Sequence, residues 1–196
     1  MNTWGELMLS AVHTVSEMTA LGFGLDRDAF TKRSALGPHL LAPTGSDLGK
    51  HHNLDAIFAG FHYDLNFLTI HGKSRYPGLF VWRRDGSKVS VSVPDGCLLV
   101  QAGKQLEWLT GDAVHAGYHE VICTPATLKA IERQKAAGRP TWRVSSTLFF
   151  HIASDQTLEP LGKFSTEETR AKYPAMLAGD YVNEELKVIN LKRTSQ

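Results

Sequence analysis

The segment FHYDLNFLTIH, residues 61–71, is apolar and aromatic enough for a buried strand, yet it carries an imidazole and a carboxylate two positions apart. Alternate residues of a strand point to the same face, so His62 and Asp64 are expected to converge while Tyr63 points away. An imidazole and a carboxylate on one face provide two of the three protein ligands of a non-haem iron site. A His–Asp pair at a strand end without a metal explains the same two residues, so the rest of the chain must decide between these interpretations.

The composition bounds the class of protein. The 196 residues fit one domain, and a hydrophobic share of 42% is enough for a core. The charges nearly balance, with 21 Lys and Arg against 20 Asp and Glu, which gives no electrostatic reason to expect nucleic acid or a membrane surface as partner. The N-terminus has no basic leader, and Cys97 and Cys123 lie in apolar, strand-like surroundings. We therefore expect buried free thiols and a cytoplasmic location.

The periodicity of apolar residues changes along the chain. Three- and four-residue steps predict an amphipathic helix from Trp4 to Leu21, and a short second helix is expected from Asp26 to Ser34. From Ala56 to His151 the pattern is that of short strands separated by turn residues, which favours a sandwich or jelly roll. The expected strands include residues 79–82, 88–93, 97–101, 106–109, 115–124 and 142–153. A solvent-facing helix is expected at residues 125–138, and helices return after His151.

A third iron ligand must come from elsewhere in the chain. His119 is expected in the middle of a strand, where a ligand is held rigidly. His115 shares its strand face and is the spare candidate. Farther along, Arg143 and Ser145 share one face of the last long strand, and a guanidinium fork with a hydroxyl suits a carboxylate ligand. Each motif is weak alone, and their order along the chain is what favours a site.

The chain resembles the isopenicillin-N-synthase-like family of Fe(II)/2-oxoglutarate-dependent dioxygenases from about residue 37 to about residue 160. The matching segments, in order, are His62-Tyr63-Asp64, Gly78-Leu79-Phe80-Val81, Pro94-Asp95-Gly96, Gln105-Leu106-Glu107-Trp108, His119-Glu120-Val121 and Arg143-Val144-Ser145. The resemblance implies a mainly β fold with flanking helices, that is, a double-stranded β-helix of the jelly-roll or cupin-like kind between a long N-terminal helix and a C-terminal helix.

The resemblance also implies the chemistry. His62, Asp64 and His119 would bind Fe(II), and Arg143 with Ser145 would bind the cosubstrate 2-oxoglutarate. A small organic substrate would be hydroxylated or otherwise oxidised with release of succinate and carbon dioxide, and ascorbate is a further expected cofactor. Four partly aromatic candidates for the substrate pocket are Asn66, Tyr76, Trp82 and Trp108.

Some features depart from the family pattern. Lys104 replaces an acidic residue, and the interval between His119 and Arg143 is longer than usual, which the helix at residues 125–138 accounts for. The chain begins at the long helix that relatives place well inside their sequences. We therefore expect the usual N-terminal lobe to be absent, and a second copy or a partner chain to cover the exposed face.

We expect residues 1–196 to form one oxygenase-like domain: helical support in residues 1–36, a jelly-roll core in 37–160 and a C-terminal helical segment in 161–196. Two other functions fit the same residues. One is a shortened, inactive relative that acts as a binding or interaction protein. The other is an iron oxidase of the same fold that does not use 2-oxoglutarate.

Overall fold

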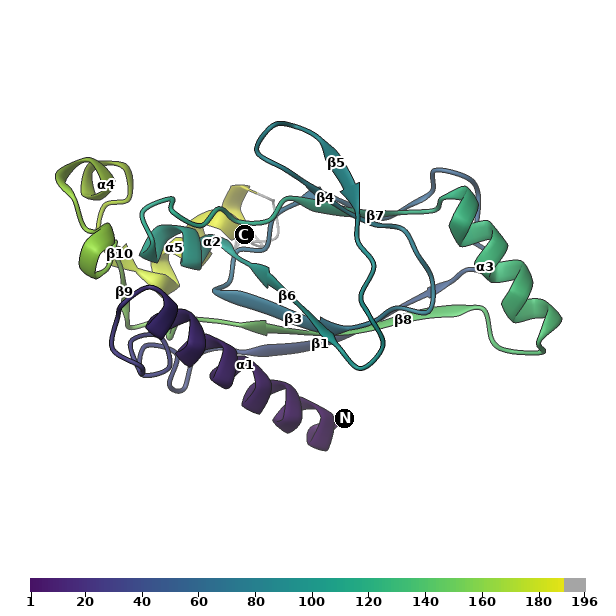
Figure 1. Ribbon diagram of the computed structural model, residues 1–196, viewed down its shortest axis with the longest axis horizontal. Coiled ribbons are helices and arrows are strands. Elements are labelled where there is room, and N and C mark those ends of the chain that lie inside the picture. The colour runs from purple at the N-terminus through teal and green to yellow at the C-terminus, as the bar shows by residue number, and fades with distance from the viewer. Residues whose placement is uncertain (189–196) are drawn as a thin grey trace, which may run out of the picture.

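Two four-stranded antiparallel sheets face each other at the centre of the computed structural model, which describes residues 1–188 (Figure 1). The predicted mainly β fold with flanking helices is confirmed. Residues 189–196 of the predicted C-terminal segment lie outside the described residues. The elements are α1 (Asn2–Gly22), β1 (Leu40–Asp47), β2 (Ile57–His62), β3 (Leu68–Gly72), β4 (Leu79–Trp82), β5 (Lys88–Ser90), β6 (Leu98–Ala102), α2 (Lys104–Leu109), β7 (His119–Ile122), α3 (Pro125–Ala136), β8 (Trp142–Phe150), β9 (Thr157–Leu158), the 3-10 turn η1 (Gly162–Phe164), α4 (Glu167–Lys172), β10 (Met176–Leu177) and α5 (Ala178–Val188).

The main hydrophobic core lies outside the pair of sheets, between the first sheet and α1. That sheet has the strand order β1-β8-β3-β6. Leu68 pairs with Phe150 and Ile70 pairs with Leu148, so these four side chains share one face. All four are buried, and they belong to one cluster with Met8 of α1. Figure 1 shows α1 lying along this face of the sheet.

Helix α1 confirms the predicted amphipathic helix, but its buried stripe is narrow. The buried residues recur every four positions, at Met8, Val12, Ser16 and Ala20. Other apolar side chains of the helix stay in solvent, and Leu7 is 60% exposed. None of the helices in residues 1–188 combines the length and apolar character needed to cross a membrane.

The opposite face of the first sheet looks toward the second sheet and is polar. Because Leu148 and Phe150 face α1, the alternate positions Arg143, Ser145 and Thr147 face inward. The second sheet has the strand order β2-β7-β4-β5 and places His62 of β2 directly opposite His119 of β7. The space between the sheets therefore presents polar groups from both sides.

Several predicted elements are corrected by the structure. Residues 106–109 belong to helix α2 and not to a strand, because the start of that helix docks on backbone carbonyls of the chain after β2. Residues 26–34 form hydrogen-bonded turns and not a helix. Cys97 is exposed, since it follows the turn at Gly96, whereas Cys123 is buried as expected. The predicted helix at residues 125–138 is confirmed as α3, which Thr124 caps.

Removing a side chain from the α1 interface tests where the core lies. Phe150→Ala should lower the free energy of unfolding by about 3–5 kcal/mol, because it leaves a cavity in fully buried surroundings. Val144→Ala on the same strand is the matched control, since Val144 is 55% exposed, and should change it by less than about 0.5 kcal/mol. Urea denaturation measures both values, and equal effects would contradict this placement of the core.

Candidate metal centre and adjoining cleft

Asp64 is placed by a segment that joins the two sheets, residues 63–67, here called the connector. Strand β2 ends at His62 and β3 begins at Leu68, so the expectation that His62 and Asp64 lie on one strand is wrong. The two side chains still converge, because the connector is held against the start of α2. The amide of Lys104 donates to the Asp64 carbonyl at 2.8 Å, and that of Gln105 donates to the Asn66 carbonyl at 3.1 Å.

Gly103 permits this close approach of the two segments. A Cβ atom at Gly103 would lie 2.0 Å from the carbonyl oxygen of Asn66, a distance that no side chain tolerates. The absent side chain therefore allows the N-terminal end of α2 to fix the backbone that carries Asp64.

Both histidines are oriented in the same way. Nδ1 of His62 lies 2.6 Å from the carbonyl oxygen of Gly60, and Nδ1 of His119 lies 2.9 Å from that of Gly117. A carbonyl can only accept, so each Nδ1 carries a proton, and in the neutral imidazole each Nε2 then has a lone pair available. This is the arrangement that metal-binding histidines use, with one nitrogen fixed by the backbone and the other free to bind the metal.

The carboxylate of Asp64 completes the group. Its Oδ1 lies 3.8 Å from Nε2 of His62 and 3.9 Å from Nε2 of His119, which is too long for hydrogen bonds. Its Oδ2 accepts a hydrogen bond from Thr69 at 2.6 Å, which leaves Oδ1 free. The three free donor atoms lie within 4.8 Å of one another. If the distances between these atoms shortened by about 1 Å, they would match those between three ligand atoms that each lie about 2 Å from one ion.

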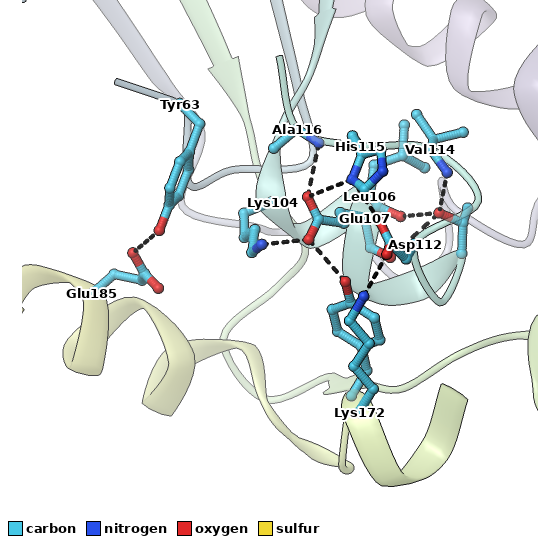
Figure 2. A network of polar contacts seen from close by, with 12 residues as sticks. Tyr63, Lys104, Leu106, Glu107, Asp112, Val114, His115, Ala116, Lys172 and Glu185 are labelled. Atoms are coloured by element: carbon cyan, nitrogen blue, oxygen red, sulfur yellow. Dashed lines mark hydrogen bonds and ion pairs between the residues drawn. The ribbon is translucent and has the colours of Figure 1, made fainter. Parts of the chain in front are cut away.

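A second group of ionisable residues, Glu107, Asp112 and His115, also lies within 4.8 Å, but its carboxylates are engaged with cationic and hydrogen-bonding neighbours (Figure 2). Glu107 pairs with Lys104 and accepts hydrogen bonds from the Tyr173 hydroxyl and the Ala116 amide, both at 2.9 Å. Asp112 is paired with Lys172 and, at 2.5 Å, with Nδ1 of His115. His115 lies outside β7, in the loop that precedes it, and is not part of the group around Asp64.

Arg143 is a largely buried cation that lacks a carboxylate partner among residues 1–188. Its Nε is buried without a hydrogen-bond partner, and no ion pair to it occurs in this part of the chain. Burial lowers the pKa of the guanidinium, although a group of this kind stays charged. The hydroxyl of Ser145 lies 3.2 Å from that of Thr147 on the same inward face. Since a buried charge is costly unless it is paired, the chemistry of these side chains suits an anionic ligand.

A cleft of about 1110 Å³ opens beside His62 and Asp64. It is bounded by the start of β1, the connector, the end of β8 and helix α5. Of the four predicted pocket residues, Asn66 lines the cleft, and the other three do not. Tyr76 is buried beside Leu48, Trp82 packs edge-on against Phe61, and Trp108 packs between Tyr173 and Tyr181.

The structure adds cleft residues that the sequence did not assign to the substrate pocket, among them Phe149, His151 and several side chains of α5. Phe149 could have been found, because the alternation that places Arg143 and Ser145 on the inner face continues to Phe149 along the same strand. The contribution of α5 could not, because it depends on how a distant helix packs.

Similar proteins were found in three comparisons. Residues 40–152, more than half of the chain, match the family described as the 2OG-Fe(II) oxygenase superfamily. The chain is 25% identical over 195 residues to kihadalactone A synthase LFS of Citrus sinensis, which covers 93% of this chain and 52% of that protein. It is 27% identical over 128 residues to the 2-oxoglutarate-dependent dioxygenase phqC of Penicillium fellutanum, which covers 64% of this chain and 35% of that protein.

Solved structures share the fold. A 2OG-Fe(II) oxygenase family protein of Caulobacter crescentus matches with a TM-score of 0.79 and 28% identity, covering 95% of this chain and 58% of that one. A full-length protein of Neurospora crassa, solved in complex with alpha-KG, matches with a TM-score of 0.76 and 21% identity, covering 95% and 56%. The chain thus spans about half the length of these relatives.

The Glu107 carboxylate fixes the loop before β7 and so the approach to His119. Burial raises the pKa of Glu107, but the donors from Lys104, Ala116 and Tyr173 outweigh it and hold the pKa below its usual value. A lowered folded-state pKa means that the stabilisation is present above the unfolded-state value of about 4.3 and is lost as the pH falls through the folded-state pKa.

Glu107→Ala should therefore reduce the hydrogen-exchange protection of the Ala116 amide by at least about tenfold, because a buried hydrogen bond to a charged acceptor is lost. Tyr173→Phe is the control, because it removes a donor to Oε1 of Glu107 and leaves the contact between the Ala116 amide and Oε2. In this variant, hydrogen exchange of the Ala116 amide should stay near that of the unaltered chain. Amide exchange followed by NMR at neutral pH measures both. Unchanged protection in Glu107→Ala would show that the carboxylate does not hold this loop.

Proposed function

We propose an oxygenase function for this chain, which belongs to the 2OG-Fe(II) oxygenase superfamily. In this proposal it oxidises a small organic molecule, by hydroxylation or a related reaction, with consumption of 2-oxoglutarate and release of succinate and carbon dioxide. The observation that carries the proposal is the position of the free Nε2 atoms of His62 and His119, each less than 4 Å from the same oxygen of Asp64.

His62, Asp64 and His119, here called the triad, would hold Fe(II). Two histidines and one carboxylate with open positions are the ligand set of non-haem Fe(II) oxygenases. Bound iron and 2-oxoglutarate would supply the oxidising chemistry by activating dioxygen as the cosubstrate is decarboxylated. The chain itself contributes orientation: Gly60 and Gly117 fix the imidazoles, and Thr69 fixes the carboxylate.

Arg143 and Ser145 would bind the distal carboxylate of 2-oxoglutarate. The support is the partly buried guanidinium with its buried, unpartnered Nε, and a carboxylate would pair with this group through charge and hydrogen bonds together. Because Arg143 faces inward on β8, the carboxylate would be bound in the space between the two sheets. The same observation favours a 2-oxoglutarate-dependent enzyme over an iron oxidase that lacks the cosubstrate.

The location and assembly of the protein are part of the proposal. Two free cysteines, one of them exposed, suit a reducing compartment such as the cytoplasm. We treat residues 1–196 as one oxygenase-like domain. Coverage of an exposed face by a second copy or a partner chain, and a role for ascorbate, stay predictions from the sequence.

Substitution of the triad tests the metal assignment. Succinate release that depends on Fe(II) and 2-oxoglutarate should fall by more than about a hundredfold in each of three variants: His62→Ala, Asp64→Ala and His119→Ala. Removing a metal ligand is expected to cost more activity than removing a hydrogen-bond partner of that ligand. The same variants should lose Mn(II) binding in calorimetric titrations. His115→Ala is the matched control, because His115 belongs to the neighbouring paired group, and should keep both. Turnover retained by the triad variants would refute the assignment.

Substitution of Arg143 tests the cosubstrate site separately. Arg143→Gln should weaken 2-oxoglutarate binding by at least about thirtyfold, because it removes one partner of a buried charge pair. Mn(II) affinity should be unchanged, since Arg143 is not a ligand. Arg143→Lys keeps the charge without the planar fork, so its affinity for 2-oxoglutarate should lie between those of the unaltered chain and of Arg143→Gln. Equal 2-oxoglutarate affinity in all three proteins, measured by calorimetry with Mn(II) present, would contradict the assignment of Arg143, and absence of binding to the unaltered chain would favour the oxidase alternative.

A further inference from the structure

The cleft beside the triad has walls that are mainly apolar. Leu40 and Phe149 line it from the first sheet, and Val182 and Leu186 line it from α5. His62 and Asp64 lie on the same lining, so a molecule held in the cleft would reach the triad directly. Apolar walls with few polar groups are typical of sites for organic ligands, and the volume lies just above the usual range of about 300–1,000 Å³.

Helix α5 is tied to the connector across this cleft. The hydroxyl of Tyr63 donates to the carboxylate of Glu185 at 3.0 Å, and Figure 2 shows the two side chains meeting from opposite segments. Burial, followed by the interaction with Glu185, raises the pKa of Tyr63 to about 12, so the phenol stays protonated and continues to donate. The helix that forms one wall is therefore held in place by a contact near the triad.

The charge of the cleft argues against an anionic substrate. No Lys or Arg lines it among residues 1–188, and its two carboxylates are Asp64 and Glu185. Lys104 lies over the Tyr63 ring, but its charge is paired with Glu107. In the metal-free chain, an anionic ligand would thus meet two carboxylates and no Lys or Arg of residues 1–188, which is unfavourable in a site of low dielectric constant.

Several polar side chains of the cleft have no hydrogen-bond partner within residues 1–188, and His151 is the one whose unpartnered atom is buried. Nδ1 of His151 has no partner in the described chain, while the His151 amide donates to Nδ1 of His39 at 3.1 Å. Burial, with a smaller effect of His39, lowers the pKa of His151 to about 4, so the imidazole is neutral at physiological pH. The side-chain nitrogen of Asn66 is not free to bind a ligand oxygen, because it already donates to the carbonyls of Leu68 and Phe150.

We propose that the substrate bound in this cleft is a neutral, largely apolar compound with a hydrogen-bonding oxygen, and that His151 binds that oxygen. The proposal rests on the oxygenase function, because it takes the cleft to be the substrate side of the triad. His151 is then a specificity residue: it selects the substrate and orients its carbon skeleton toward the triad through a contact that apolar walls cannot provide.

Three probes of matched size separate the contributions: 2-tetralone, the hydrocarbon tetralin and tetralin-2-carboxylate. Each is titrated calorimetrically into the metal-free full chain at about pH 7, where His151 is neutral. Without a metal, the carboxylate probe cannot bind through metal ligation, and the result does not depend on catalytic activity. We expect the affinity for 2-tetralone to be at least about fivefold higher than that for tetralin, because one net hydrogen bond contributes about this much. The carboxylate should bind at least about tenfold more weakly than the ketone.

His151→Phe removes the hydrogen bond and keeps an aromatic ring. It should reduce the preference for 2-tetralone over tetralin to less than about twofold while tetralin affinity is kept. Ser154→Ala, another polar position of the cleft, should leave that preference unchanged. The proposal is overturned if the carboxylate binds as tightly as the ketone, if His151→Phe keeps the ketone preference, or if 2-tetralone does not bind. If the probes behave as expected but the chain forms no succinate, the oxygenase proposal fails and the ligand class of the cleft stands.

Discussion

The docking of the connector on the first turn of α2 is the contact on which the candidate site depends. Two amides of that turn, from Lys104 and Gln105, bind the carbonyls of Asp64 and Asn66, and Gly103 makes the approach sterically possible. Without it, Asp64 would lie in a free loop between two sheets. With it, the carboxylate is held opposite two imidazoles that neighbouring strands fix independently. The same helix carries Glu107, which holds the loop leading to His119, so α2 organises two of the three members of the triad.

The distribution of apolar residues explains how the space between the sheets can be kept for chemistry. Leu148, Phe150 and their partners turn away from the second sheet and pack against α1, so stability is gained outside the barrel. The inner face is then free to carry Arg143, whose burial costs free energy that an anionic ligand would offset. The site is thus separated from the packing that maintains the fold, and the cleft continues it toward α5.

The sequence predicted the parts of the site that depend on local periodicity. Alternation along a strand correctly placed Arg143 and Ser145 on one face, and the change from helical to strand periodicity predicted the fold class. The proximity of His62 and Asp64 was predicted for the wrong reason: both were expected on one strand, but Asp64 lies beyond the end of β2. The helical state of residues 104–109 was missed, because a short apolar run is ambiguous and tertiary contacts decided it. The aromatic candidates Tyr76, Trp82 and Trp108 lie outside the cleft, because composition alone does not give direction.

The central claim is that three side chains from β2, the connector and β7 converge on one metal ion. A crystal structure of the full chain grown with Mn(II) and 2-oxoglutarate tests it most directly. We predict one ion at about 2.0–2.3 Å from Nε2 of His62, Oδ1 of Asp64 and Nε2 of His119. An ion bound instead by Glu107, Asp112 and His115, or a triad that stays unligated at saturating Mn(II), would contradict the account.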